Sequence, residues 1–335
     1  MKKVITIVTI LVLMVSMTGC NMIYDMMSPK EIPTIVLDET DETEETEEVT
    51  ESKKKKDGLT RTEFGEDGKL AFTEHNYLNI GIYAHDGVSA VELSGVHSIL
   101  NKIITPEMSD VERIKAVHDW LVKNTTYVEN YYELDDSRSF IYNLIFNKIA
   151  ICQGYAVTFY VMMTELGIPC TIVSGEAGVL HAWNAVKLDG KWYYVDVTWD
   201  DPILDNENGN NYPDGYNMSY QYLLCTYEQI SKTHSEDDYR PNQPSPKGEI
   251  NSYNDLVYEL AGYKGVYRIN DEDDATEIAF VIEEPGRYMI YVDDGMDVEN
   301  QAEQIYLLLK IRSVIKPEKG SSRLLGSDSF ILEIY

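Results

Sequence analysis

Two segments in the middle of the chain place apolar residues at helical spacing. In "SDVERIKAVHDWLVK", Ser109 is followed three residues later by Glu112, and apolar residues then recur three and four positions apart. This spacing forms one apolar face of a helix, and a serine with a glutamate three residues later is a capping box. The pattern therefore predicts a helix over this segment, in which His118 and Trp120 serve to pack and cap the core.

The second helical pattern follows a cysteine. After Cys152, the segment "GYAVTFYVMMTELGIPC" repeats apolar residues at intervals of three and four and then presents Gly167 and Pro169. Glycine and proline are typical of the residues that follow the end of a helix. We therefore predict a helix that begins at or just after Cys152 and stops before Gly167.

Three strand-like segments come next. They are "CTIVSG", "AWNAVKL" and "KWYYVDVTW", and the last two are separated by Asp189 and Gly190 alone. An Asp-Gly pair between two such runs is the strongest short signal for a β-hairpin. The sequence therefore predicts that the second and third segments pair as neighbouring antiparallel strands.

This hairpin brings a histidine close to a carboxylate. With the two-residue turn, counting outward along both strands pairs His181 with Thr198. Asp196 and Asp200 are then the two diagonal neighbours of His181 on the same face of the sheet. A carboxylate next to a histidine selects one tautomer and stabilises the protonated ring. The count alone does not choose between the two acids.

Cys152 has the position that a nucleophilic thiol needs. A helix N-terminus and a nearby imidazole both favour the thiolate, which is the reactive form. Gly154 allows another backbone segment to approach the start of the helix, where backbone N–H groups also face an oxyanion. A cysteine or a histidine taken alone is more often a core residue. Cysteine, histidine and carboxylate together predict nucleophilic catalysis.

Beyond about residue 240 the chain changes character. The Pro-rich segment "PNQPSPKGE" leads into a final part in which we find no chemical constellation. We predict a small α/β accessory domain over residues 241–335. Its expected elements are helices near 254–262 and 298–314 and strands near 277–282, 288–292 and 330–334.

The N-terminus has the pattern of a secretory signal. Two lysines precede an apolar run, and Thr18 and Gly19 stand directly before Cys20. This ending resembles the lipobox of bacterial lipoproteins, in which the signal is cut before a cysteine that then carries lipid. We expect a signal peptide over residues 1–19, lipidation at Cys20, and a membrane-anchored chain on the extracytoplasmic face. An uncleaved membrane anchor is the alternative.

The residue composition limits which segments fold and which partners we expect. Residues 20–60 are dense in charge and poor in apolar side chains, so we expect a disordered acidic tether. The formal net charge of −29 and the pI of about 4.4 argue against nucleic acid as a partner. With Cys20 acylated, three cysteines remain, an odd number that implies no disulfide framework. Segment 200–215 is rich in oxygen ligands but lacks the spacing of a calcium loop, and we interpret it as a solvated loop.

Several blocks occur in the order known from one protein family. These blocks are "CQGYA", "GI", "VSG", "HAWN", "LDGKWYYVDVTWDDP" and "YLLCTYEQISKTH", and they resemble the bacterial branch of the transglutaminase-like superfamily. The resemblance covers roughly residues 104–234. It implies an α+β, papain-like core with helices packed on an antiparallel sheet. The domain would extend over 104–240, after an N-terminal extension at 61–103.

The same resemblance assigns roles to residues. It implies that Cys152 is the nucleophile, His181 the general base and Asp196, rather than Asp200, the acid that orients the histidine. The chain has "AICQG" where protein-crosslinking transglutaminases have "GQCW", which speaks against glutamine–lysine crosslinking and against a calcium requirement.

We therefore expect an enzyme that acts on amide bonds through a thioester, as a peptidase, amidase or acyl transferase. Its substrate would be a peptide or protein amide, with cell-wall peptides as one class, and it would need no cofactor or metal. The alternative is a catalytically inactive binding or scaffolding module that keeps the fold. The intact set of cysteine, histidine and aspartate weighs against that alternative.

Overall fold

The computed structural model describes residues 60–75, 77, 87–201, 218–237, 253–271, 273–293, 295–311, 320–324 and 329–334. The predicted signal peptide, the lipidation site Cys20 and nearly all of the tether lie outside these residues, as do residues 202–215 of the oxygen-rich loop. Among the described residues, no helix combines the length and the apolar character needed to cross a membrane.

A five-stranded antiparallel sheet carries most of the expected strands. Its order is β6-β5-β4-β3-β7. The predicted hairpin is confirmed, because β4 and β5 pair from Leu188 opposite Lys191 to Asn184 opposite Val195. The strand bounds are β3 Cys170–Glu176, β4 Leu180–Leu188, β5 Lys191–Val195, β6 Leu223–Cys225 and β7 Ser235–Glu236.

The third predicted strand is shorter than expected. It ends at Val195 instead of continuing to Trp199, so the expected pairing of His181 with Thr198 does not form, and His181 pairs with Gly175 of β3. The chain turns because the Asp196 side chain accepts the backbone N–H of Trp199 at 3.0 Å, and the Asp196 carbonyl accepts that of Asp200. Such side-chain bonds to the local backbone compete with strand pairing.

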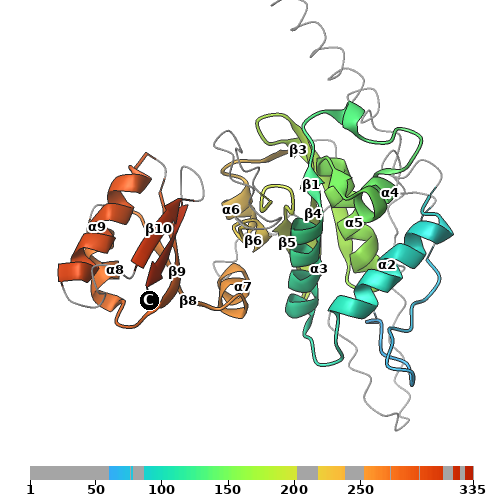
Figure 1. The fold of residues 1–335 in the computed structure, drawn as a ribbon, viewed down its shortest axis with the longest axis horizontal. Helices are drawn as coiled ribbons and strands as arrows, with labels where there is room; N and C mark the ends of the chain where they lie inside the picture. The colour runs from blue at the N-terminus through green and yellow to red at the C-terminus, as the bar shows by residue number, and fades with distance from the viewer. Residues whose placement is uncertain are drawn as a thin grey trace, which may run out of the picture.

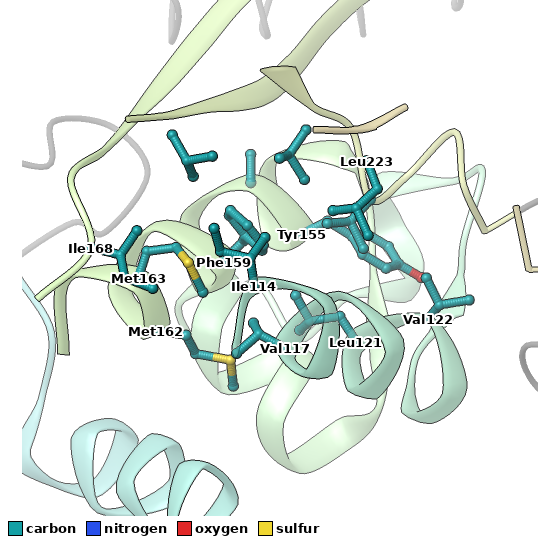
Figure 2. Packing of buried hydrophobic residues seen from close by; sticks show 14 of the residues in the cluster. Ile114, Val117, Leu121, Val122, Tyr155, Phe159, Met162, Met163, Ile168 and Leu223 are labelled. Atoms are coloured by element: carbon teal, nitrogen blue, oxygen red, sulfur yellow. The ribbon is translucent and has the colours of Figure 1, made fainter. Parts of the chain in front are cut away.

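Three helices form the other layer. They are α2 Ala90–Ile103, α3 Asp110–Asn124 and α5 Cys152–Glu165. The predicted capping box at Ser109 and Glu112 is confirmed. Helix α5 contacts β3 and β4 on one side and α2 and α3 on the other, which explains why almost all of its residues are buried. In Figure 2, apolar side chains of α3 and α5 interdigitate in this core.

Short elements connect α3 to α5. Strand β1 (Thr126–Tyr127) pairs in parallel with β2 (Ile149–Ala150), immediately before α5. Between these two strands lie the 3-10 helix η2 (Tyr131–Glu133), α4 (Phe140–Tyr142) and the π-helix η3 (Asn143–Asn147). The sequence pattern gave no sign of these elements, but the β1–β2 pair fixes the entry to α5.

The C-terminal part forms a four-stranded sheet of order β10-β11-β9-β8, with β8 and β9 parallel. Helices α8 and α9 lie together beside this sheet, and α7 contacts both β8 and α3 (Figure 1). The elements are α7 Asn254–Leu260, β8 Tyr263–Ile269, α8 Asp274–Val281, β9 Gly286–Val292, α9 Val298–Ile311, β10 Gly320–Leu324 and β11 Ser329–Ile334.

One prediction in this part is wrong. Residues 277–282, expected as a strand, belong to helix α8 and its C-cap. Ala275, Ile278 and Ala279 are buried at helical spacing, and the Asp274 carboxylate accepts backbone N–H groups that precede the helix. A short apolar run does not by itself distinguish a buried strand from a helix. The expected helices near 254 and 298 and strands near 288 and 330 are present.

Candidate functional site

Cys152 is the first residue of α5. Its side chain is buried, with 6% of the residue exposed, and Sγ donates to Gln153 Oε1 at 3.1 Å. The N-cap residue Ile151 provides no side-chain cap. At the start of α5 the backbone N–H groups of Gly154 and Tyr155 donate to the carbonyl of Ile151, while the N–H groups of the first helical residues point toward the end of the helix where a ligand can bind. The predicted helix start at Cys152 is therefore confirmed.

Gly154 is needed for close packing at the start of α5. A Cβ atom at this position would lie 2.9 Å from Cβ of Ala150 in β2. The group packed against Gly154 is therefore a side chain of β2, whereas the sequence analysis expected a backbone segment at this place. The missing side chain lets β2 and α5 meet tightly, and this sets the direction of the turn that carries Cys152.

The structure brings His181 and Asp196 into direct contact. His181 lies in β4 and Asp196 directly follows β5, and Nε2 of the histidine is 2.6 Å from Oδ2 of the aspartate. The Asp196 backbone N–H donates to the carbonyl of Tyr222 at 3.0 Å. Because Nε2 is engaged by Asp196, Nδ1 is the ring nitrogen left for the cysteine.

Charge and burial act in opposite directions on this pair. Burial would lower the pKa of His181, but Asp196 and the Cys152 thiol outweigh it and raise this pKa to about 10. Burial would raise the pKa of Asp196, but His181 and His234 hold it well below its usual range. The two groups therefore form an ion pair at neutral pH, with a positively charged imidazole interacting with the thiol.

Asp200, the other acid that the hairpin count left open, has a different partner. Its Oδ2 is 3.2 Å from Nε2 of His118 in α3, and its Oδ1 accepts the backbone N–H of Tyr222. Both His118 and Asp200 are fully buried. His118 is thus a buried residue that ties α3 to the turn after β5, which extends the packing role expected for it.

A third residue at the site, His234, did not stand out in the sequence. Its Nε2 lies 2.9 Å from the same Oδ2 of Asp196 that contacts His181. It occurs in the block "YLLCTYEQISKTH", after the short helix α6 (Tyr227–Ile230) and directly before β7. These elements are too short to show periodicity, and the position of the histidine in that block was the only available signal.

Gly175 explains how His234 reaches the site. A Cβ atom on Gly175 in β3 would lie 2.0 Å from the carbonyl oxygen of Ser235 and 2.9 Å from the Trp183 ring. Only a residue without a side chain lets β7 approach β3 this closely. This approach places the residue before Ser235, which is His234, beside Asp196.

The other two cysteines among the described residues, and one tyrosine, also have shifted pKa values. Burial raises the pKa of the Cys170 and Cys225 thiols well above the usual value, which makes both poor nucleophiles. Tyr127 in β1 was also missed. Burial, followed by the charge of Cys152, raises its pKa to about 12.

His181, Asp196 and His234 are the one group within the described ranges whose donor atoms could hold a metal ion, since these atoms lie within 4.8 Å of one another. Zinc–nitrogen bonds of ~2.0–2.1 Å in a tetrahedron keep two ligand atoms roughly 3.3 Å apart. The distances of 2.6 and 2.9 Å from Nε2 to Oδ2 are shorter and are those of hydrogen bonds. The donor set therefore forms a proton-linked network.

Part of this chain is similar to known proteins. Residues 97–197 match the family described as the transglutaminase-like superfamily. Kyphoscoliosis peptidase from Mus musculus is 29% identical and that from Homo sapiens 27% identical, each over 126 residues. Each match covers 33% of this chain and 19% of the relative, so the chain spans about a fifth of the length of these curated relatives.

A solved structure of a TGase shares 20% identity with a TM-score of 0.31, over 58% of this chain and 50% of that chain. Cys152, His181 and Asp196 all lie inside the range matched by the family, whereas His234 lies beyond it. Residues 97–197, where helices pack on an antiparallel sheet in an α+β fold, are the part of the chain that matches the transglutaminase-like superfamily.

Proposed function

We propose that the protein is a cysteine-dependent enzyme that transfers acyl groups from amides through a thioester. The observation that carries this proposal is the His181–Asp196 ion pair, whose imidazole interacts with a cysteine at a helix N-terminus. A positively charged imidazole favours the thiolate, and the thiolate is the nucleophile.

The reaction follows from this arrangement. The Cys152 thiolate attacks the amide carbonyl carbon, and the backbone N–H of Cys152 contributes to stabilising the oxyanion. The protonated His181 donates its proton to the leaving nitrogen as the C–N bond breaks, which leaves a thioester and a free amine. His181 then takes a proton from water or an amine, which attacks the thioester, forms the acid or the new amide and restores the thiolate. Asp196 holds His181 in orientation and stabilises its charged form throughout.

The experiment incubates the full chain with peptide amides and with one of two acyl acceptors, water alone or an added primary amine. We expect peptide amides to be hydrolysed in water, or joined to a labelled primary amine when one is present, with the products identified by mass. A transient mass increase on the peptide containing Cys152 would reveal the thioester. If no candidate peptide is turned over and Cys152 is unreactive, the inactive binding module that keeps the fold becomes the better account.

For the location, we propose a lipid anchor at Cys20 on the extracytoplasmic face, and peptides or proteins at that face as substrates. The support is the pattern of lysines, apolar run and small residues before Cys20. Replacing Cys20 by serine should release the chain from the membrane fraction. Mass analysis of the mature N-terminus should find an acylated Cys20, and an N-terminus at another residue would contradict the anchor.

A further inference from the structure

Two imidazoles converge on one carboxylate oxygen at the centre of the site. Asp196 Oδ2 is 2.6 Å from Nε2 of His181 and 2.9 Å from Nε2 of His234. The other oxygen, Oδ1, accepts the backbone N–H of Trp199 at 3.0 Å. Asp196 is fully buried, so these three donors determine the orientation of its carboxylate.

His234 is itself held in place. Its Nδ1 lies 2.8 Å from Oγ1 of Thr233, and its backbone N–H donates to the carbonyl of Ile230. The aromatic rings of Trp183, Trp199 and Tyr222 surround its ring at centroid distances of 5.0, 4.6 and 5.3 Å. A ring that is bonded at both nitrogens and packed by three aromatic side chains presents its Nε2 to Asp196 in one direction.

We propose that His234 is a positioning residue that clamps Asp196 Oδ2 in line with His181, so that the reactive imidazole keeps one orientation toward Cys152. This inference rests on the proposed function. His234 has no role in the proposed reaction steps, and it acts only through Asp196.

The effect of removing the clamp follows from the geometry. Without His234, the carboxylate keeps its bonds to the Trp199 N–H and to His181 but loses the second donor on Oδ2, so rotation about its Cβ–Cγ bond is less restrained. The contact between Asp196 and His181 then weakens, and the charged form of His181 loses part of its stabilisation. A fixed carboxylate is what makes such a histidine effective.

The groups that set the charge state around this clamp come from several elements. His181 belongs to β4, Cys152 to α5 and Tyr127 to β1, and all three interact with each other or with Asp196. Burial and, less strongly, the charge of Asp196 also raise the pKa of Asp200 and of Cys225. Among the described residues, only His181 and His234 donate a side-chain hydrogen bond to Asp196.

The test measures the rate at which iodoacetamide labels Cys152 in the full chain, between pH 6 and pH 11, with the labelled peptide identified by mass. The variants are His234→Phe, which removes the donor and keeps an aromatic ring, and His234→Gln, which keeps an N–H donor. The matched control is His118→Gln, which changes the fully buried histidine that contacts Asp200 and leaves Asp196 untouched. Thermal unfolding of each variant is recorded alongside.

We expect His234→Phe to label about tenfold more slowly than the wild type at pH 7, a difference of ~1.4 kcal/mol. Above about pH 10 the two rates should converge, because an unassisted thiol ionises near pH 8.5 and no longer needs the imidazolium. His234→Gln should stay within about threefold of the wild type. His118→Gln should unfold at a lower temperature yet label at the wild-type rate.

Several results would overturn the inference. One is that Cys152 of His234→Phe labels at the wild-type rate at pH 7. Another is that His118→Gln slows the labelling of Cys152 as much as His234→Phe does. A third is that the slower labelling in His234→Phe is still present, and equally large, at pH 11. A rate that falls on adding EDTA and returns with one equivalent of Zn²⁺ would make His234 a metal ligand instead. If wild-type Cys152 labels no faster than Cys170 and Cys225, the proposed function itself fails, which is a separate outcome.

Discussion

Replacing Cys152 by alanine should abolish amide turnover and leave the fold intact. The thiol is the only group in the proposed reaction that forms a covalent bond to the substrate, so its loss should reduce kcat by a factor on the order of 10⁵ or more. Removing one sulfur atom from the end of a helix leaves a small cavity, and the cost in free energy of unfolding should be about 1 kcal/mol or less. Turnover and thermal unfolding measured on the same preparation separate these two effects.

A companion variant tests why Cys152 reacts. Replacing His181 by alanine removes the imidazolium that stabilises the thiolate. A free cysteine is only a few per cent thiolate at pH 7, so the labelling of Cys152 should slow by roughly tenfold to thirtyfold. Cys170 and Cys225 should label equally slowly in both proteins, since burial raises the pKa of both thiols. A Cys152 that reacts only after unfolding would be a core thiol, and catalysis by this residue would be excluded.

Replacing Asp196 by asparagine should reduce turnover by about 10²–10⁴-fold. The asparagine side chain has one acceptor oxygen in place of two, whereas the structure presents donors from His181, His234 and Trp199. Whichever way the amide faces, its NH₂ group meets a donor, and His181 loses a negatively charged partner. The pKa of His181 should therefore fall below about 10 in this variant. As pH rises, the protonated imidazole that stabilises the thiolate should be lost at a lower pH than in the wild type.

The same change should also cost stability, by ~1–3 kcal/mol, because a buried donor is left unsatisfied. Asp200→Asn is the matched control, since Asp200 is equally buried and contacts His118 and not His181. We expect Asp200→Asn to lower the unfolding temperature while reducing turnover much less than Asp196→Asn. Equal losses of turnover in the two variants, with equal losses of stability, would mean that both acids are structural.

The helices and the hairpin were predictable because their signals are local. Ser109 with Glu112, the apolar spacing after Cys152 and the Asp189-Gly190 turn each act within a few residues, and the structure confirms all three. The hairpin count predicted Asp196 and Asp200 as the two acids beside His181, although β5 ends before either of them. The count could not choose between the two, because Asp200 contacts His118 of α3, a residue distant in the sequence.

The missed features depend on contacts that no local pattern encodes. Strand β7 has two residues, and its place beside β3 requires the missing side chain at Gly175. His234 enters the site only through this contact. The sequence predicts a strand where α8 lies, because a short run of apolar residues fits both structures, whereas the acidic residues at its start are typical of a helix N-terminus.

The order of the site residues along the chain has a consequence for biosynthesis. Cys152 comes first, Asp196 follows His181 by 15 residues, and His234 follows Asp196 by a further 38. A nascent chain therefore exposes the thiol before the groups that activate it have been translated. If His181 activates Cys152 as proposed, the cysteine stays an ordinary thiol until the hairpin of β4 and β5 has docked on α5, and its reactivity should emerge together with completion of the fold.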